Sequence, residues 1–213
     1  MKNKINMVII LILLFFLYFC ISAFSYAQNI STDLSENVFR LHVIANSDTD
    51  YDQELKFKVR DNLLKYMNEI CVNCKTKQDA ISIVQANKER FQQIAIDTIK
   101  EEGYSYPVNI NIGYFEFPTK NYGDISLPAG LYDALRVEIG EAKGQNWWCV
   151  MFPPLCFVDI SSGIVPEDSK AILEENLSDE EFALISEKSG SDIQFKFRLV
   201  ELFNKTGLFT AKN

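Results

Sequence analysis

PVNINIGYFEFPTKNYGDISLPAGLYDALRVEIGEAKGQNWWCVMFPPLCFVDI, the stretch Pro107–Ile160, decides the fold of this chain. It contains both tryptophans, five of the six prolines and two of the five cysteines. Its apolar residues alternate with polar ones at period two, which is typical of strands with one buried face. Glycines and prolines separate these alternating segments. The stretch therefore predicts a small, mainly antiparallel sheet.

Three strands are predicted within this stretch. The first begins at Val108, and its apolar positions change parity after Gly113, which predicts a β-bulge at that glycine. The second is Leu135–Ile139, and Gly140–Asn146 is predicted to close a hairpin to the third. The third strand, Trp147–Phe152, has no polar side, so we expect both of its faces to be covered. The proline pair that follows should end it, because proline cannot donate to a ladder.

A further strand and a helix start are predicted upstream of this stretch. Val38–Ala45 alternates, with Arg40 and His42 on its polar face. Acidic residues then recur at alternate positions of Asn46–Asp52, as in a calcium-binding loop. Counted from Asp48, however, the sixth position is glutamine and the twelfth is valine, where such a loop needs glycine and glutamate. The short oxygen-bearing side chains instead predict the start of a helix.

Two long helices are predicted to pack on the sheet. Apolar residues recur at helical spacing from Tyr51 to Ile70, with Lys56, Arg60 and Lys65 on the opposite, exposed face. Thr76-Lys-Gln-Asp79 is typical of a capping box that begins a second helix, which runs to about Glu102 and ends at Gly103. The buried stripe of this second helix should contain Ala80, Val84, Phe91, Ala95 and Ile99.

The first 27 residues predict export. Lys2 and Lys4 precede the uncharged apolar run Met7–Phe24, and Ser25-Tyr-Ala27 offers small residues at the two positions that a signal peptidase reads. The run is also long enough to span a bilayer, so a cleaved signal peptide and an uncleaved N-terminal anchor both stay open. The two lysines place the N-terminus in the cytoplasm and residues 28–213 outside it.

Composition limits what the exported part can bind. Removing the first 27 residues takes away two lysines and no acidic residue, so the net charge changes from −8 to −10. Nucleic-acid binding through overall charge is therefore excluded. The apolar content suffices for one compact domain with a core, and no long linker divides it.

The cysteines leave several functions open. Cys71-Val-Asn-Cys74 has the spacing of a thiol-disulfide oxidoreductase motif, but it follows a predicted helix C-terminus, whose field destabilises a thiolate. Zinc held by Cys71, Cys74, Cys149 and Cys156 would require reduced thiols outside the cytoplasm. Structural disulfides, most simply Cys71 with Cys74 and Cys149 with Cys156, suit that compartment better. Their connectivity cannot be deduced from the sequence.

The C-terminal part is acidic. Val165–Asp192 predicts two short helices, the first with Pro166 in its opening turn and the second begun by a Ser178-Asp-Glu-Glu181 capping box. Ile193–Phe203 predicts a terminal helix. The fold class is therefore α+β: one domain with a small, mainly antiparallel sheet, two long helices on it and short acidic helices near the C-terminus.

Several long segments of the sequence are more specific than a spaced glycine motif. The first is Arg40-Leu-His-Val-Ile-Ala-Asn-Ser-Asp48, followed by Lys58-Val-Arg-Asp61. The others are Phe117-Pro-Thr-Lys120 with Tyr122-Gly123, Pro128-Ala-Gly130 with Ala134-Leu-Arg-Val137, and Asn146-Trp-Trp-Cys-Val150 running into Phe152-Pro-Pro-Leu-Cys156. These segments cover roughly half of the chain, and they resemble the stage II sporulation protein R family of endospore-forming bacteria.

The resemblance implies a signalling protein rather than an enzyme. Such a protein is made in the forespore and exported into the space between the two membranes. There it activates a membrane-embedded aspartic protease of the mother cell, of the stage II sporulation protein GA type, which cleaves the pro-sigma-E precursor. No cofactor, metal or small-molecule substrate is implied.

Two alternatives remain besides a protein ligand, namely the thiol-disulfide oxidoreductase using Cys71 and Cys74, and a cell-wall binding protein or hydrolase exposing Trp147 and Trp148. A hydrolase needs two carboxylates placed across a sugar, and no nucleophile-elbow, zinc-protease or phosphate-binding motif occurs in the sequence.

Six polar residues within the segments that match the family are the predicted partner-binding site, because loops on a rigid scaffold often contain the residues that bind a partner. They border the sheet in two loop regions and are expected to be exposed. The alternative is that Asn46 and Asp48 only cap a helix and that Lys120 lies in an ordinary turn. The six residues are Arg40, His42, Asn46, Asp48, Lys120 and Tyr122.

Overall fold

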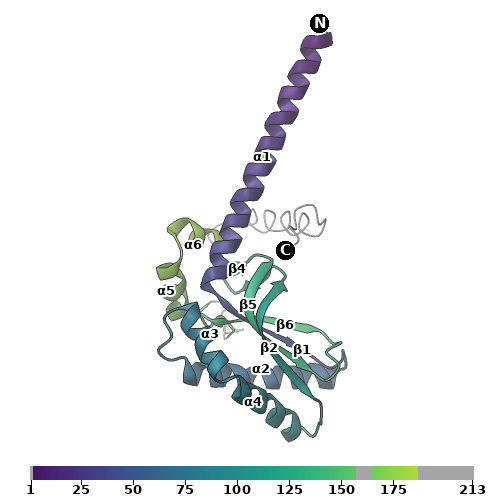
Figure 1. The fold of residues 1–213 in the computed structure, drawn as a ribbon, viewed down its shortest axis with the longest axis vertical. Coiled ribbons are helices and arrows are strands. Elements are labelled where there is room, and N and C mark those ends of the chain that lie inside the picture. Colours follow the sequence, from purple (N-terminus) through teal and green to yellow (C-terminus); the bar gives the residue numbers. More distant parts are fainter. Residues whose placement is uncertain (1, 157–164, 187–213) are drawn as a thin grey trace.

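The computed structural model describes residues 2–156 and 165–186 as an α+β domain with a long N-terminal helix projecting from it (Figure 1). This confirms the predicted fold class. The helices are α1 (Lys2–Asn37), α2 (Asp50–Ile70), α3 (Lys77–Ala86), α4 (Lys88–Glu101), α5 (Glu167–Asn176) and α6 (Asp179–Ile185). The strands are β1 (Phe39–Ile44), β2 (Val108–Phe117), β3 (Lys120–Tyr122), β4 (Ile125–Leu127), β5 (Gly130–Ile139) and β6 (Asn146–Phe152).

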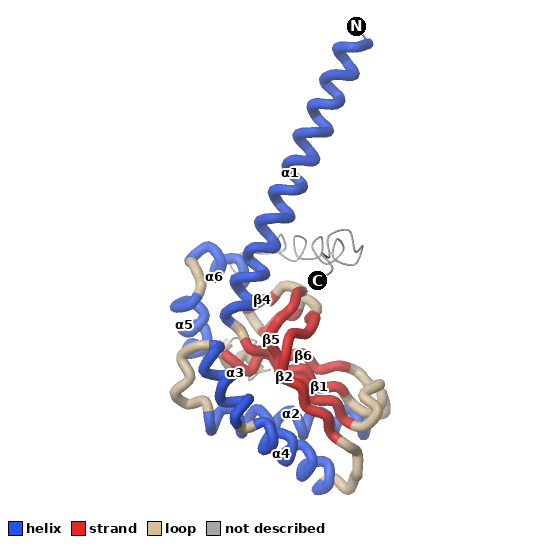
Figure 2. Tube along the Cα trace, viewed as in Figure 1, coloured by secondary structure: helices blue, strands red, loops and turns tan. Residues whose placement is uncertain are grey.

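The main sheet has the strand order β2-β5-β1-β6, and β3 and β4 form a separate small ribbon (Figure 2). β1 runs parallel to β5, whereas β1·β6 and β2·β5 are antiparallel. The predicted hairpin at Gly140–Asn146 is wrong, because β1 lies between β5 and β6. All six residues of β1 are buried, and a strand buried on both faces is accommodated in the interior of a sheet.

The predicted bulge at Gly113 is also wrong. β2 pairs with β5 in one constant register, from Val108 opposite Ile139 to Phe117 opposite Gly130. The apolar positions change parity because the sheet has a core on each face. Val108 belongs to the core beneath the helices, and Phe117 belongs to a second core on the opposite face. One regular strand therefore places apolar residues on different faces along its length.

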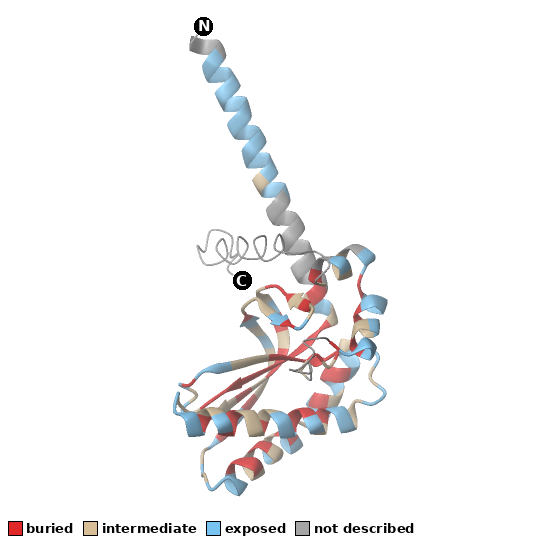
Figure 3. Ribbon diagram, turned by 180° about the vertical axis from the view of Figure 1, so that it is seen from behind, coloured by how far each residue is buried: buried red, intermediate tan, exposed pale blue. Residues whose placement is uncertain are grey.

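The first core lies between the sheet and helices α2, α3 and α4 (Figure 3). α2 begins as predicted, since Thr49 is its N-cap and accepts a hydrogen bond from the Asp52 N–H. The first three residues of its predicted apolar stripe are buried, Tyr66 and Ile70 are partly buried, and Lys65 is exposed. All five residues predicted for the stripe of the second helix are buried. The central members of this core are Phe39, Leu41, Val43, Leu55, Val59, Leu63, Phe91, Leu135, Val137 and Met151.

The prediction that Lys56 is exposed is wrong. Its side chain is 2% exposed, and Nζ donates to the backbone oxygen of Gln145, 3.1 Å away, and to Oε1 of Gln53. The loop between β5 and β6 therefore lies close to this part of α2. Burial lowers the pKa of Lys56, and the neighbouring Arg60 lowers it further. Arg60 lies over the Trp147 ring, 4.3 Å from its centroid, and the Arg60 side chain is 18% exposed, so this predicted exposed residue is largely covered as well.

The second long helix is in fact two helices. The capping box of Thr76 and Asp79 begins α3 as predicted, and α4 is followed by Gly103 at φ +84°. Asn87 interrupts the helix with φ −114° and ψ 18°. Its side chain donates to the Ile83 oxygen and accepts from the Tyr66 hydroxyl, which holds this residue between the two helices. Asparagine competes well with helical hydrogen bonding in this way.

Helix α1 continues without interruption from the apolar N-terminus to the domain. Its segment Ile5–Ser22 is long and apolar enough to cross a membrane and is not buried in the protein. Its last turns reach the domain, where Leu34 is fully buried in the second core. Lys77 of α3 donates to the Ser35 backbone oxygen and pairs with Asp133, which ties this end of α1 to the domain. The division of the chain at Ala27 stays a prediction.

The acidic C-terminal helices cover the second core. α5 contributes Leu173, its C-cap residue is Leu177, and α6 contributes Ile185 to this core. The predicted capping box of Ser178 and Glu181 begins α6, whereas Pro166 is the N-cap of α5 rather than a residue of its first turn. The predicted terminal helix Ile193–Phe203 lies outside the described residues.

Candidate partner-binding site

The six predicted partner-binding residues do not form one surface. Asn46 and Asp48 follow the C-terminal end of β1, beside the end of β5 at Glu138. Lys120 lies in β3, which follows the end of β2 that pairs with Gly130, the first residue of β5. The two predicted loop regions therefore lie beyond opposite ends of the sheet.

Arg40 is fully buried, contrary to the expectation that it is exposed. It lies on the face of β1 that points away from α2, where the second core covers it. Its guanidinium is 4.1 Å from the centroid of the Phe117 ring and 4.6 Å from that of Tyr132. Ring faces attract a cation, and this attraction strengthens when water is excluded. The aromatic residues therefore supply part of the stabilisation that burial removes.

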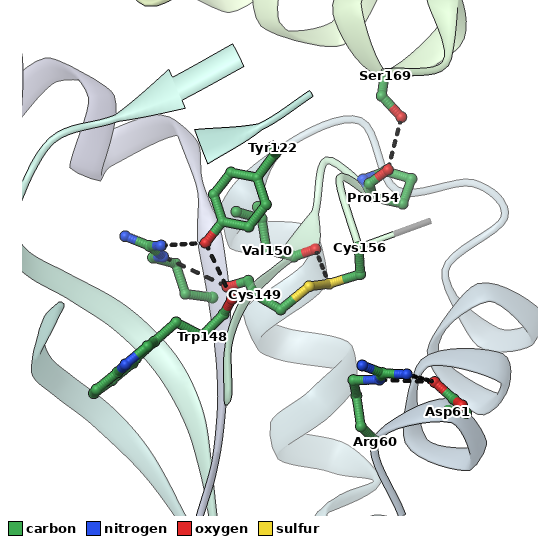
Figure 4. The surroundings of a disulfide bond; sticks show 10 residues. Arg60, Asp61, Tyr122, Trp148, Cys149, Val150, Pro154, Cys156 and Ser169 are labelled. Carbon is green, nitrogen blue, oxygen red and sulfur yellow. Dashed lines mark hydrogen bonds and ion pairs between the residues drawn. A yellow bond between two sulfur atoms is a disulfide. The ribbon is translucent and has the colours of Figure 1, made fainter. Parts of the chain in front are cut away.

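Tyr122 is the hydrogen-bonding partner of this buried cation. Its hydroxyl accepts from Nη2 of Arg40 at 2.5 Å and donates to the Trp148 backbone oxygen at 3.3 Å (Figure 4). Burial raises the pKa of Tyr122, although Arg40 opposes this, so the phenol stays protonated and can donate. No ion pair to Arg40 occurs within residues 2–156 and 165–186, and its Nη1 is buried without a partner there. Nε of Arg40 also donates to the Cys149 backbone oxygen at 3.5 Å, so the charge depends on aromatic, hydroxyl and backbone contacts.

His42 is also buried, with 3% of its surface exposed. Its ring stacks on Trp148 with centroids 3.7 Å apart. Nε2 lies 2.7 Å from Oδ1 of Asn146, so the tautomer that carries its proton on Nε2 fits. Burial lowers the pKa of His42 to about 4, and Arg136 and Arg40 contribute in the same direction. The imidazole is therefore neutral at physiological pH.

These residues form one cluster on the second face of the sheet, the Arg40 cluster, which consists of Arg40, His42, Phe117, Tyr122, Tyr132 and Trp148. Sequence reasoning selected three of its members as surface residues and missed Phe117, Tyr132 and Trp148 as their partners. The alternation of β1 placed Arg40 and His42 on a common face, but a second core on that face was not foreseen.

Asn46 has a structural role, although it is not the predicted helix cap, because Thr49 is the N-cap of α2. Its Nδ2 donates to Asp52 at 2.8 Å, and its Oδ1 accepts from the Glu141 N–H at 2.9 Å. A Cβ atom at Gly140, whose φ is +60°, would lie 2.2 Å from Oδ1 of Asn46. A Cβ at Gly144 would lie 2.2 Å from the Ser47 backbone oxygen. The loop after β1 and the loop after β5 are therefore packed together so closely that both positions require glycine.

Asp52, near the start of α2, binds the loop that follows β1. It is 4% exposed and accepts hydrogen bonds from Asn46 and from the Ser47 hydroxyl at 2.6 Å. Burial raises the pKa of this carboxyl, but the hydrogen bonds from Ser47 and Asn46 outweigh it, and the net shift is downward. Asp52 is therefore ionised and holds the start of α2 against the loop. Asp48 is exposed and Lys120 is half-buried, so these two can still be reached by a partner.

Four cysteines lie as two neighbouring pairs, the same pairs as in the simplest predicted arrangement. Cys71 lies next to Cys74, with Cα atoms 5.1 Å apart, and Cys149 lies next to Cys156, with Cα atoms 5.6 Å apart (Figure 4). The second pair connects β6 to the turn that follows it. Cys71 is the C-cap of α2, at the negative end of the helix dipole. Among the described residues, no three histidine, cysteine or acidic side chains lie close enough to hold a metal ion.

The folded region from β1 to β6 is the part of the chain that known proteins share. A family model described as Stage II sporulation protein R matches residues 35–162. The chain belongs to the stage II sporulation protein R family. Stage II sporulation protein R of Bacillus subtilis (strain 168) is 35% identical over 137 residues, which cover 64% of this chain and 61% of that protein. The match thus spans about three fifths of the relative's length. No solved structure matches the chain.

The family region contains the main sheet, the helices of the first core and every member of the Arg40 cluster. Helices α5 and α6 lie beyond it, although they cover the second core. The segments that match the stage II sporulation protein R family therefore include residues of the protein interior, because Arg40, His42 and Tyr122 are buried. Whether any of the six predicted residues contacts a partner stays a prediction.

Proposed function

We propose that this chain is an extracytoplasmic signalling protein that activates a membrane-embedded aspartic protease of the stage II sporulation protein GA type. That protease would then process pro-sigma-E. The observation that carries the proposal is the family match over residues 35–162, which coincides with the packed domain from β1 to β6. Sporulation is the process that the family name assigns; the protease and its precursor are our finer proposal.

The proposed location is the space between the forespore and mother-cell membranes. The apolar segment Ile5–Ser22 of α1 is compatible with export and with membrane association. Two adjacent cysteine pairs also suit an extracytoplasmic compartment, where disulfides persist. Cleavage after Ala27 would release the domain, whereas retention would leave it tethered. We propose that export alone suffices for activity.

We propose that the chain acts as a protein ligand and not as a catalyst. Cys71 sits at the end of α2 where the dipole disfavours a thiolate, which argues against the oxidoreductase alternative. The purified domain is expected neither to cleave the precursor nor to reduce a test disulfide. Turnover that disappears in a Cys71→Ser variant would contradict this view.

For partner contact we propose the accessible members of the predicted site, Asp48 and Lys120. Arg40, His42 and Tyr122 would act by holding β1, β3 and β6 in place, because buried side chains cannot reach a partner without unfolding. Asn46 would do the same for the loop that carries Asp48.

The test is co-expression of the full chain, the protease and the precursor in a host that does not sporulate. The precursor should be shortened only when all three are present, and omission of either the chain or the protease is the control. A version with an efficiently cleaved foreign signal peptide should activate equally. Normal secretion of that version without activation would show that tethering is needed, and no processing with the complete set would refute the proposed function.

A further inference from the structure

Strand β2 forms one edge of the main sheet over ten residues, Val108–Phe117. Its ladder with β5 has no register shift. The edge strands of soluble proteins are commonly protected by charges, prolines, bulges or short length, because unpaired backbone groups invite another strand. β2 has no bulge, a single charged residue at Glu116, and prolines only outside it, at Pro107 and Pro118.

Alternate residues of β2 direct their backbone groups away from the sheet. The Gly140 N–H donates to the Pro107 oxygen at 2.8 Å, which identifies this as a hydrogen-bonded pair of the antiparallel ladder. Such pairs alternate with pairs whose N–H and C=O point outward. The outward groups therefore belong to the even-numbered residues. Gln92 donates to the outward Val108 oxygen at 3.1 Å, as this alternation requires.

The remaining outward groups are open in the described part of the chain. They are the N–H and C=O groups of Ile110, Ile112, Tyr114 and Glu116, for which no hydrogen bond outside the ladder is present among residues 2–156 and 165–186. The opposite edge of the sheet differs. On β6 the Trp148 oxygen accepts from Tyr122, and Cys156 Sγ lies 2.8 Å from the Val150 oxygen.

Exposed apolar side chains lie beside this open edge. Tyr114 is 65% exposed and Leu131 of β5 is 57% exposed. Leu131 pairs with Glu116, and Tyr114 is two residues from Glu116, so all three side chains share one face of the sheet. The edge therefore combines open backbone groups, two apolar side chains and a carboxylate with no ion pair among the described residues.

We propose that β2 binds an extended segment of a partner protein as an additional strand of the sheet. This rests on the proposed function, since the partner would be the activated protease. The segment should place an apolar side chain against Tyr114 and Leu131, and a lysine or arginine beside Glu116. Charge complementarity with a chain of net charge −8 favours a basic segment. Main-chain hydrogen bonds would supply affinity and the side chains specificity.

A second copy of this chain fits the edge less well. Two antiparallel β2 strands in one continuous sheet are related by a two-fold axis normal to that sheet. The end of α1 is joined through Lys77 to Asp133, near the end of the sheet where β2 ends and β5 begins (Figure 1). The axis would place the two α1 helices at opposite ends, so both could not enter the same membrane. Like net charges would also repel.

The direct test is hydrogen exchange on the full chain, alone and in membranes that also contain the co-expressed protease. In the free chain, the amides of Ile112 and Tyr114 should exchange fast, and those of the neighbouring ladder residues Asn111, Gly113 and Phe115 should exchange slowly. With the protease, the fast amides should slow by about tenfold or more. Tyr114→Pro removes one outward backbone donor and leaves the backbone hydrogen bonds to β5 in place, so it should reduce activation while the domain stays folded.

A charge variant has a matched control. Tyr114→Lys should reduce activation about tenfold or more, because it places a cation against a basic segment. Tyr51→Lys, at a tyrosine that is 74% exposed on α2, should activate normally.

Processing by the natural chain with unchanged exchange in β2, or full activity of Tyr114→Pro, would overturn strand addition and leave the proposed function intact. No processing by the natural chain would overturn both. If the β2 amides of the chain alone exchange more slowly as its concentration rises, and sedimentation detects dimers, the edge binds a second copy of this chain. That result would overturn the proposal.

Discussion

Lowering the pH is expected to destabilise the domain through His42. The imidazole is buried against Trp148, and burial lowers its pKa from 6.5 to about 4. A histidine with a lowered folded-state pKa binds its proton more readily in the unfolded chain, so protonation favours unfolding. The contribution of His42 is therefore constant above pH 6.5 and is lost as the pH falls from 6.5 towards about 4.

The size of this effect follows from the two pKa values. Linkage gives at most about 1.4 kcal/mol per pH unit, and integration between the folded and unfolded pKa values gives a loss of about 2 kcal/mol at a pH of about 5. That is a large part of the stability of an ordinary domain, roughly 5–15 kcal/mol. Asp52, whose pKa is lowered, loses its contribution only as the pH falls through the ordinary carboxyl range around 3.8. The two windows are therefore separable.

The assay is favourable because His42 is the only histidine of the chain. Its imidazole signals in a proton–nitrogen NMR spectrum need no assignment, and their titration gives the folded-state pKa directly. Urea unfolding of residues 28–213, from about pH 7.5 to about pH 5, gives the stability slope. The His42→Gln variant should be less stable than the natural chain at neutral pH, but its free energy of unfolding should no longer depend on pH over this range. An imidazole that titrates near 6.5, or equal slopes for both proteins, would refute this reasoning.

Three further predictions concern single contacts. Tyr122→Phe removes the hydroxyl that accepts from the buried guanidinium and should lower the free energy of unfolding in urea by about 1.5–3 kcal/mol. The control is Tyr51→Phe, at an exposed position on α2, which should change the free energy of unfolding by no more than about 0.5 kcal/mol. Equal effects of the two changes would show that the buried hydrogen bond contributes nothing. Gly140→Ala should cost about 2 kcal/mol or more, because its Cβ would lie 2.2 Å from the Asn46 amide oxygen. Gly103→Ala is the control, since it shares a positive φ but has no atom within 4 Å, and should cost about 1 kcal/mol; comparable losses would contradict the close approach. Lys120→Ala should leave stability within about 0.5 kcal/mol and reduce protease activation, and normal activation would remove Lys120 from the partner surface.

Local features of this protein could be predicted from the sequence because each depends on neighbouring residues. The capping boxes at Thr76 and Ser178 begin α3 and α6 as predicted, because the side chain and the N–H groups that it serves are only three residues apart. The buried stripes of the helices followed from their period. The apolar segment of α1 was equally clear, because its length and composition alone make it compatible with a membrane.

Only the tertiary structure decided which strands are neighbours and which faces are covered. Period-two patterns describe one strand at a time, so they could not predict that β1 lies between β5 and β6. Nor could they predict that the connection from β5 to β6 passes over the end of β1 and is not a hairpin. They also could not reveal a second core. The parity change near Gly113 was interpreted as a bulge for that reason, although the strand is regular.

The same limit applies to the candidate site. Arg40 and His42 are polar residues on an alternating strand, so the sequence by itself correctly determined that they share a face but not that this face is buried. Burial depends on α1, α5, α6 and the β3–β4 ribbon, which come from distant parts of the chain. This guanidinium is tolerated inside because aromatic rings, a tyrosine hydroxyl and a backbone oxygen converge on it, and only three-dimensional packing brings Phe117, Tyr122 and Tyr132 to Arg40.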